Sequence, residues 1–103
     1  MDLNLDKDGY LLDTAEWSRE IADQLANDSG VQLTDDHWQV LELLRNFYQE
    51  FEHAPSQRPF VKYIANHLGK EKGSSMYLMK LFPESPAKLA ARIAGLPRPT
   101  NCF

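Results

Sequence analysis

The sequence of 103 residues has a single cysteine, Cys102, and no long apolar run, and each shortage excludes a class of protein. One cysteine cannot close a disulfide within the chain, which excludes a disulfide-stabilised secreted domain. No stretch approaches the roughly 20 apolar residues of a membrane helix, and residues 1–6 lack the cationic and apolar regions of a signal peptide. We therefore expect a protein of the reducing cytoplasm that has no membrane partner.

The sequence also lacks the motifs of metal sites, phosphate loops and self-contained hydrolases. Its three histidines and Cys102 have none of the close spacings of zinc ligands, which argues against a metal site. The segment Gly69–Ser74 lacks the Gly-Lys-Ser/Thr ending that a P-loop needs. Cysteine hydrolases pair their nucleophile with a histidine, but a nucleophile near a chain end is poorly preorganised for such chemistry. The sequence therefore predicts no bound cofactor and no metal.

Acidic residues outnumber basic ones, with a net charge of -4, but the two halves of the chain differ in sign. Residues 1–52 hold 13 acidic and three basic residues, whereas residues 53–103 hold eight basic and two acidic residues. Such a field steers an acidic partner or a phosphate backbone toward the basic half, which contains Cys102. Pairing between the halves of one folded domain produces the same pattern, so both interpretations stay open.

Apolar residues at helical spacing predict five helices. The first two begin at Asp13 or Thr14 and at Thr34, the third has Pro59 in its first turn, and the last two begin at Ser74 or Ser75 and at Ser85. They end near residues 27, 51, 68, 82 and 94. Each start has a residue that favours a helix amino terminus, and each end has a glycine, proline or polar stop. Trp17, Ile21 and Leu25 form the apolar stripe of the first helix. The second has the widest apolar surface, so we expect it to be the central helix.

The residues before the first helix predict a small β-hairpin. An Asp-Gly pair lies between the short apolar segments 3–5 and 10–12, and this dipeptide favours a hairpin turn. The connection 70–75, between the third and fourth helices, resembles that of a helix-turn-helix. The expected fold is mostly α (α+β): one domain over residues 1–103, with five helices, a helix-turn-helix-like core, an N-terminal hairpin and an extended C-terminal arm.

The last nine residues, 95–103, predict a mobile, cysteine-bearing arm. Gly95 suits the left-handed position that ends many helices, and Pro97 and Pro99 bias the chain toward extended conformations. From Leu96 to Cys102 such an arm spans roughly 20 Å at about 3.3 Å per residue. A thiol on an arm of this reach can enter the active site of another protein.

Cys102 is the candidate catalytic residue, because the thiolate is the reactive form of cysteine and an arm leaves it accessible. Positive charge favours the thiolate, so Arg98 and Arg92 are candidates for stabilising it or for docking a partner. Further candidates for docking are three lysines of the basic half: Lys88, Lys80 and Lys72. The competing interpretations are an unused cysteine on a frayed tail and a nucleic-acid-binding protein whose basic residues contact phosphates.

Several stretches of the chain resemble the DsrC/TusE family. They are Asp8–Leu11, Trp17–Ser18, His37–Trp38, Arg45–Tyr48, Gly73–Leu78, Leu81–Pro83, Pro86–Lys88 and Ile93–Pro99, followed by a cysteine at the next-to-last position, Cys102. The resemblance covers nearly the whole chain, and its last stretch is the most specific. It implies a helix-turn-helix-like helical core, an amino-terminal hairpin and a mobile carboxyl-terminal arm.

The resemblance also implies a sulfurtransferase. In this family the cysteine at the next-to-last position of the chain accepts persulfide sulfur from an upstream heterohexameric relay complex, which is TusBCD-like. It then passes the sulfur to a tRNA thiouridylase, which modifies the wobble uridine of tRNA. This role maps onto Cys102, with a transient cysteine persulfide and no bound cofactor.

One position departs from part of the family. Members that serve dissimilatory sulfite reductase carry a second cysteine eleven residues before the last one, and this chain has Ala91 there. The chain therefore cannot close the disulfide of that branch, which favours the role in tRNA thiolation. The alternatives are a DsrC-like sulfur carrier for another sulfur pathway and a nucleic-acid-binding regulatory protein.

Overall fold

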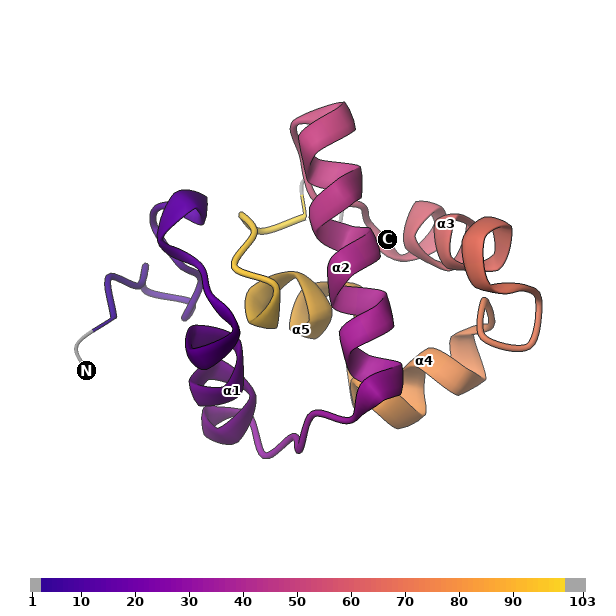
Figure 1. Cartoon of the computed structure of the whole chain (residues 1–103), viewed down its shortest axis with the longest axis horizontal. Coiled ribbons are helices and arrows are strands. Elements are labelled where there is room, and N and C mark those ends of the chain that lie inside the picture. Colours follow the sequence, from indigo (N-terminus) through magenta and orange to yellow (C-terminus); the bar gives the residue numbers. More distant parts are fainter. Residues whose placement is uncertain (1–2, 100–103) are drawn as a thin grey trace.

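The computed structural model describes residues 3–99, which contain five α-helices and one short 3-10 helix (Figure 1). In order they are η1 (Thr14–Glu16), α1 (Arg19–Asp28), α2 (Asp35–Phe51), α3 (Gln57–Leu68), α4 (Ser75–Leu81) and α5 (Pro86–Ile93). The predicted five-helix domain is confirmed. No helix among these is long and apolar enough to cross a membrane.

The short helix α5 is the hub of the fold. It packs against α1, α2, α3 and α4, and Figure 1 shows it between α1 on one side and α2 on the other. Its alanines make this possible, because Ala87, Ala90 and Ala91 are buried and their small side chains let neighbouring helices approach closely. The prediction that the second helix is central is therefore wrong: α2 is the longest helix, but it packs mainly on α5 and α3.

The first helix begins later than predicted. Asp13 caps only η1, through a hydrogen bond from Ala15 N to its carboxylate (2.9 Å), and α1 starts at Arg19 with Ser18 as its N-cap. Between these helices Trp17 has an extended backbone, so it does not belong to the stripe of Ile21 and Leu25. Local sequence favours a continuous helix here, but the Trp17 side chain is held by α5 instead, as described below.

The predicted β-hairpin is not supported, because residues 3–99 contain no strand. The chain does reverse at the Asp-Gly pair, where Leu5 and Leu11 form one isolated antiparallel bridge. The Asp6 carboxylate accepts hydrogen bonds from the backbone N–H groups of Asp8 (2.8 Å) and Tyr10 (2.9 Å). The Asp6 side chain thus takes the amide hydrogen of Tyr10, while backbone bonds from Asp6 N to Tyr10 O (2.7 Å) and from Leu12 N to Asn4 O (2.8 Å) join the two segments. The reversal therefore forms one bridge and no strand.

His37 joins the start of α2 to the end of α4. Its Nδ1 accepts a hydrogen bond from Thr34 N (3.1 Å), so the ring proton lies on Nε2, which donates to the carbonyl oxygen of Leu81 (2.8 Å). The side chain is only 7% exposed and stacks edge-on against Phe82. His37 is therefore a structural residue of the core.

The connection between α3 and α4, residues 69–74, is tight. A Cβ on Gly73 would overlap the backbone of Ala65 in α3, so only glycine fits there. Ser74 caps α4 by accepting a hydrogen bond from Tyr77 N (3.1 Å). The two helices and this turn are formed as predicted, and their comparison with a helix-turn-helix stays a prediction.

Candidate functional site

The carboxyl-terminal end of α5, where the predicted arm begins, is held by two side chains. Trp17 Nε1 donates a hydrogen bond to the carbonyl oxygen of Ile93 (2.9 Å), and Arg45 Nη1 donates to that of Ala94 (2.7 Å). The last carbonyls of a helix have no partner inside the helix, so these donors satisfy groups that would otherwise need water. Arg45 also donates to the carbonyl oxygen of Thr14 (3.1 Å) and ties the residues before α1 to the same point.

Arg45 and Trp17 also interact with each other. The guanidinium carbon lies 4.3 Å from the centroid of the Trp17 ring, which is a cation–π contact. Burial lowers the pKa of the Arg45 guanidinium below its ordinary value, because the charged form loses hydration, and Tyr48 opposes this shift. Arginine starts far above neutral pH, so the group stays charged. We call Arg45 and Trp17 the arm clamp.

The helix end itself follows the Schellman pattern that glycine permits. Gly95 has a φ of 72°, and its N–H donates to the carbonyl oxygen of Arg92 (3.1 Å), while Leu96 N donates to that of Ala91 (2.9 Å). A Cβ on Gly95 would overlap the indole of Trp17, so the clamp and the glycine fit each other. Leu96 is fully buried. The first two residues of the predicted arm therefore belong to the packed domain.

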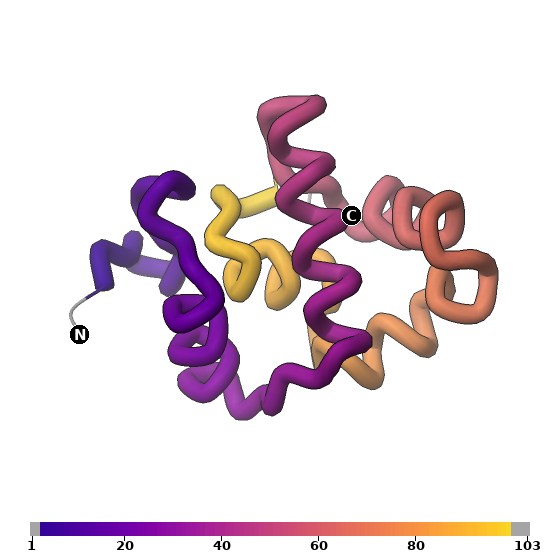
Figure 2. Tube along the Cα trace, viewed as in Figure 1, coloured from indigo at the N-terminus to yellow at the C-terminus, as the bar shows by residue number. Residues whose placement is uncertain are grey.

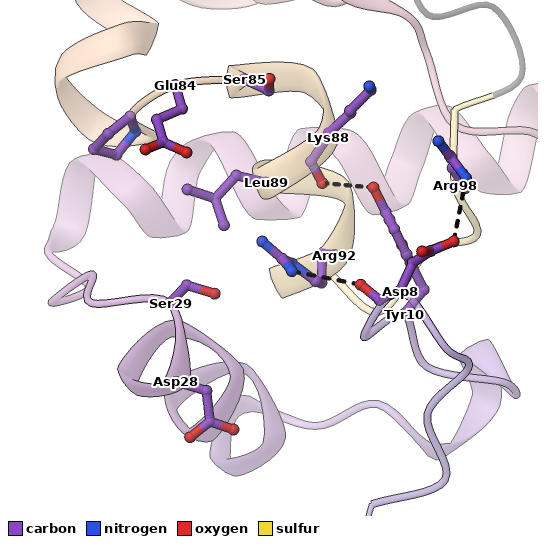
Figure 3. Close-up of a pocket in the computed structure, with 11 residues that line it drawn as sticks. Asp8, Tyr10, Asp28, Ser29, Glu84, Ser85, Lys88, Leu89, Arg92 and Arg98 are labelled. Carbon is purple, nitrogen blue, oxygen red and sulfur yellow. Dashed lines mark hydrogen bonds and ion pairs between the residues drawn. The ribbon is translucent and has the colours of Figure 1, made fainter.

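Two predicted site residues, Arg98 and Arg92, meet at Asp8 of the amino-terminal turn. Arg98 Nη1 lies 3.1 Å from the Asp8 carboxylate, and Arg92 Nη1 donates to the backbone carbonyl oxygen of Asp8 (3.5 Å), as Figure 3 shows. The Arg98–Asp8 pair is about half exposed, so it contributes at most about 1 kcal/mol. It nevertheless fixes the arm at residue 98 and partly neutralises one of the two guanidinium groups.

A cleft of about 450 Å³ opens beside this contact. Its lining comes from the amino-terminal turn, the end of α1, the α4–α5 connection, α5 and the arm: Asp8, Tyr10, Asp28, Ser29, Pro83, Glu84, Ser85, Lys88, Leu89, Arg92 and Arg98. Figure 3 shows the Arg92 side chain reaching into the space between α5 and Ser29, and Lys88 pointing away from it. The Nε of Arg92 is buried and has no hydrogen-bond partner within residues 3–99. Three carboxylates share the lining with the three bases, so the cleft is not a strongly cationic site.

The structure brings together some of the predicted site residues and separates others. Arg92, Arg98 and Lys88 line one cleft, whereas Lys80 lies exposed on α4 and does not line it. Lys72 is held at the amino-terminal end of α2, where its Nζ lies 3.4 Å from Asp36 and 2.9 Å from Gln39 Oε1. Lys72 is therefore committed to the fold in this structure. Cys102, the predicted catalytic residue, lies outside the described residues.

Sequence reasoning from spacing missed the arm clamp and Asp8. The signal for Arg45 was present, because it is a charged residue between Leu41 and Tyr48 on the apolar face of the second helix. A charge in such a position usually has buried partners. Spacing predicts Trp17 on the helix stripe and Asp8 only in a turn, because a contact across 90 positions with Arg98 has no local signature.

Comparisons with known proteins all indicate the same protein family. The sequence model of the family described as "DsrC like protein" matches residues 1–103. The chain is 52% identical over 98 residues to sulfurtransferase TusE of Pectobacterium atrosepticum, covering 95% of this chain and 90% of the relative. It is 46% identical over 103 residues to the sulfurtransferase TusE homolog of Haemophilus influenzae, covering 100% of this chain and 94% of that one.

Solved structures agree with the sequence relatives. The NMR structure of Allochromatium vinosum DsrC superposes with a TM-score of 0.87 at 44% identity, over 96% of this chain and 88% of that one. Identity at this level over nearly the full length shows that the two proteins share both the fold and the family, which confirms the resemblance seen in the sequence. The chain therefore belongs to the DsrC family, and it is a homologue of the sulfurtransferase TusE.

Proposed function

We propose that this chain carries sulfur as a persulfide on Cys102 and relays it to a tRNA thiouridylase for 2-thiolation of the wobble uridine. The observation that carries the proposal is the 52% identity to a protein named sulfurtransferase TusE, in a chain whose only cysteine is Cys102. A TusBCD-like relay complex supplies the sulfur in this account. Cytoplasmic tRNA is then the final acceptor.

The chemistry needs only one thiol from this chain. The Cys102 thiolate attacks the outer sulfur of a donor cysteine persulfide, and the donor cysteine leaves as a thiolate with the electron pair of the broken S–S bond. Cys102 then holds the persulfide. A cysteine of the acceptor repeats the attack on the outer sulfur, and Cys102 leaves as a thiolate. Neither transfer needs an external oxidant or reductant, because one sulfur atom moves and the thiolate count is unchanged.

The base of the arm supports this role. The arm clamp and the buried Leu96 fix where the arm leaves the domain, so the thiol is tethered to a defined point. Arg98 lies on the first part of the arm and Arg92 lies in the last turn of α5, and both supply positive charge that favours a thiolate or persulfide anion. Asp8 opposes part of that effect. Lys88 and Lys80 extend the positive surface toward a partner.

Ala91 distinguishes the proposal from the sulfite-reductase branch of the family. This residue is fully buried in α5, at the position where that branch is expected to have a second cysteine. A lone Cys102 cannot release sulfur by closing an internal disulfide, so a partner thiol has to remove it. The similarity to a protein named DsrC keeps a carrier for another sulfur pathway as the second candidate.

Mass spectrometry of the intact chain tests the proposal. After incubation with a protein persulfide donor and removal of the donor, the wild-type chain should gain the mass of one sulfur atom, and reduction should remove it. Cys102→Ser should gain nothing, and Lys62→Gln, a change at an exposed residue of α3, should behave like the wild type. Equal gain by Cys102→Ser would refute the carrier role.

A pull-down separates the two pathways. Cys102→Ala on a solid support should retain a tRNA thiouridylase from a lysate of the source organism. Retention of a sulfite reductase subunit instead would support the second candidate and count against tRNA thiolation.

A further inference from the structure

A second hollow adjoins the cleft and shares Glu84, Ser85 and Lys88 with it. This groove of about 360 Å³ is lined by the start of α3, by α4, by the start of α5 and by the arm: Ser56, Gln57, Ser75, Met79, Glu84, Ser85, Pro86, Ala87, Lys88 and Pro99. Gln57 Oε1 accepts a hydrogen bond from Ala87 N (3.2 Å), which holds the start of α3 against the start of α5. We call this hollow the α4 groove.

The α4 groove continues into an exposed apolar surface on α4. Met79 lines the groove and is 44% exposed, and Met76, one turn earlier, is 75% exposed. Two exposed methionines one turn apart extend the apolar surface of the groove, and exposed apolar patches often mark sites of interaction with another protein. Methionine is also adaptable in shape, which suits a surface that meets a protein partner.

Positive charges without ion-pair partners border the same surface. Lys88 lines the groove, and Lys80 follows Met79 on α4. Within residues 3–99 neither ammonium group has a carboxylate within ion-pair distance, in contrast to Lys72, which pairs with Asp36. Glu84 is the one acidic residue of the lining. An apolar segment flanked by carboxylates therefore complements this surface.

The groove also lies at the root of the cysteine-bearing segment. Figure 2 shows the yellow trace after α5 running toward α2, and Pro99 on this trace is buried and forms part of the groove wall. Cys102 follows three residues later, so its Cα lies at most about 11 Å from that of Pro99. A protein that exchanges sulfur with Cys102 must therefore approach the α4 groove.

We propose that the α4 groove is the docking site of the tRNA thiouridylase that takes sulfur from Cys102, and that this partner inserts an apolar side chain flanked by carboxylates. The inference rests on the proposed function, because the partner is defined by its exchange of sulfur with Cys102. Met79 provides the apolar contact, and Lys80 and Lys88 provide the charge complement. The partner's cysteine is then held near Cys102 while the transfer occurs.

The test separates docking from thiol chemistry. Cys102 is loaded with a low-molecular-weight persulfide, and transfer is then measured to the purified tRNA thiouridylase in single-turnover reactions at increasing concentrations. Met79→Glu should load like the wild type, because no docking is needed, but half-saturation of transfer should need about tenfold more thiouridylase. Tenfold corresponds to about 1.4 kcal/mol of binding free energy. Met79→Leu keeps the apolar contact and should transfer like the wild type.

Leu12→Glu is the matched control. Leu12 is 67% exposed and lies in the amino-terminal segment, so the same apolar-to-acidic change is made away from the α4 groove. It should leave transfer unchanged. Lys88→Glu combined with Lys80→Glu should weaken transfer and reduce its dependence on salt.

Equal transfer by Met79→Glu and Leu12→Glu would overturn the docking proposal. A change in small-molecule loading with Met79→Glu would overturn it too, because it would show that the chain's own last residues occupy the groove. Failure of the wild-type chain to load or to transfer would instead refute the proposed function. Both sites are exposed, so the variants should stay folded, and circular dichroism checks this.

Discussion

Replacing Gly95 by alanine perturbs the point where the arm leaves the domain, and the structure sets the size of the effect. Gly95 has a φ of 72°, a conformation that costs an L-residue such as alanine about 1–2 kcal/mol. The added Cβ would also overlap the Trp17 indole. Trp17 must then move, and its hydrogen bond to the Ile93 carbonyl, worth about 1 kcal/mol, is lost or weakened. We expect Gly95→Ala to lower the free energy of unfolding by about 2–3 kcal/mol, the sum of the backbone cost and the lost hydrogen bond.

Gly30→Ala provides the matched control for backbone strain. Gly30 has a similar φ of 76°, but a Cβ there would meet no heavy atom within 4 Å. The control should therefore lose only the backbone contribution, about 1–2 kcal/mol.

Urea denaturation followed by tryptophan fluorescence measures both variants against the wild type. The difference between the two variants, about 1 kcal/mol, reports the fit between Gly95 and Trp17 beyond backbone strain. Equal destabilisation by Gly95→Ala and Gly30→Ala would refute the reasoning that the indole closes the helix end. Trp17→Ala combined with Gly95→Ala should recover part of the steric cost, because the overlapping ring is gone.

Three further substitutions test the contacts around this point. Arg45→Lys keeps the charge but cannot reach two carbonyl oxygens with one fork, so urea denaturation should show a loss of about 2 kcal/mol; no loss would mean that the clamp is not needed. His37→Ala leaves the Leu81 carbonyl unpaired in the core and should lower the free energy of unfolding by about 3 kcal/mol in the same assay. A loss under about 1 kcal/mol would mean that His37 does not link α2 to α4. Asp8→Asn removes an exposed ion pair and should lower the free energy of unfolding by less than about 1 kcal/mol. In this variant Cys102 should react faster with iodoacetamide at neutral pH, because Asp8 no longer neutralises Arg98. An unchanged reaction rate would mean that Asp8 has no influence on the Cys102 thiol.

Local signals in the sequence were sufficient for most of the helices. Thr34, Ser74 and Ser85 mark helix starts in the structure as predicted, because capping depends on residues only a few positions apart. Pro59 lies in the first turn of α3 as predicted, and Ser56 is the N-cap of this helix, which starts at Gln57.

Tertiary contacts decided the remaining features. Trp17 leaves the helical path because its indole satisfies a carbonyl of α5, 76 residues away in the chain, and no local pattern encodes that bond. The hub role of α5 also escaped prediction, because an alanine-rich helix of eight residues looks minor by apolar content. Its small side chains let four other helices pack closely against it. This role becomes visible only in the packed domain.

The candidate site was predicted unequally. The family resemblance and the lone cysteine led to Cys102, whereas charge alone suggested Arg98 and Arg92, and the structure places both arginines on Asp8. Charge alone also suggested Lys72, which the structure commits to Asp36 and Gln39 of α2. A list of basic residues cannot show which of them already have partners.

Reconstituted thiolation of tRNA with radioactive sulfur tests the central claim most directly. The reaction contains the sulfur donor complex, this chain, the thiouridylase and unmodified tRNA, and it follows label on the chain and in wobble 2-thiouridine. We predict that label appears first on the wild-type chain and then in tRNA, and that Cys102→Ser abolishes both steps. Formation of labelled 2-thiouridine at the wild-type rate with Cys102→Ser would contradict the account.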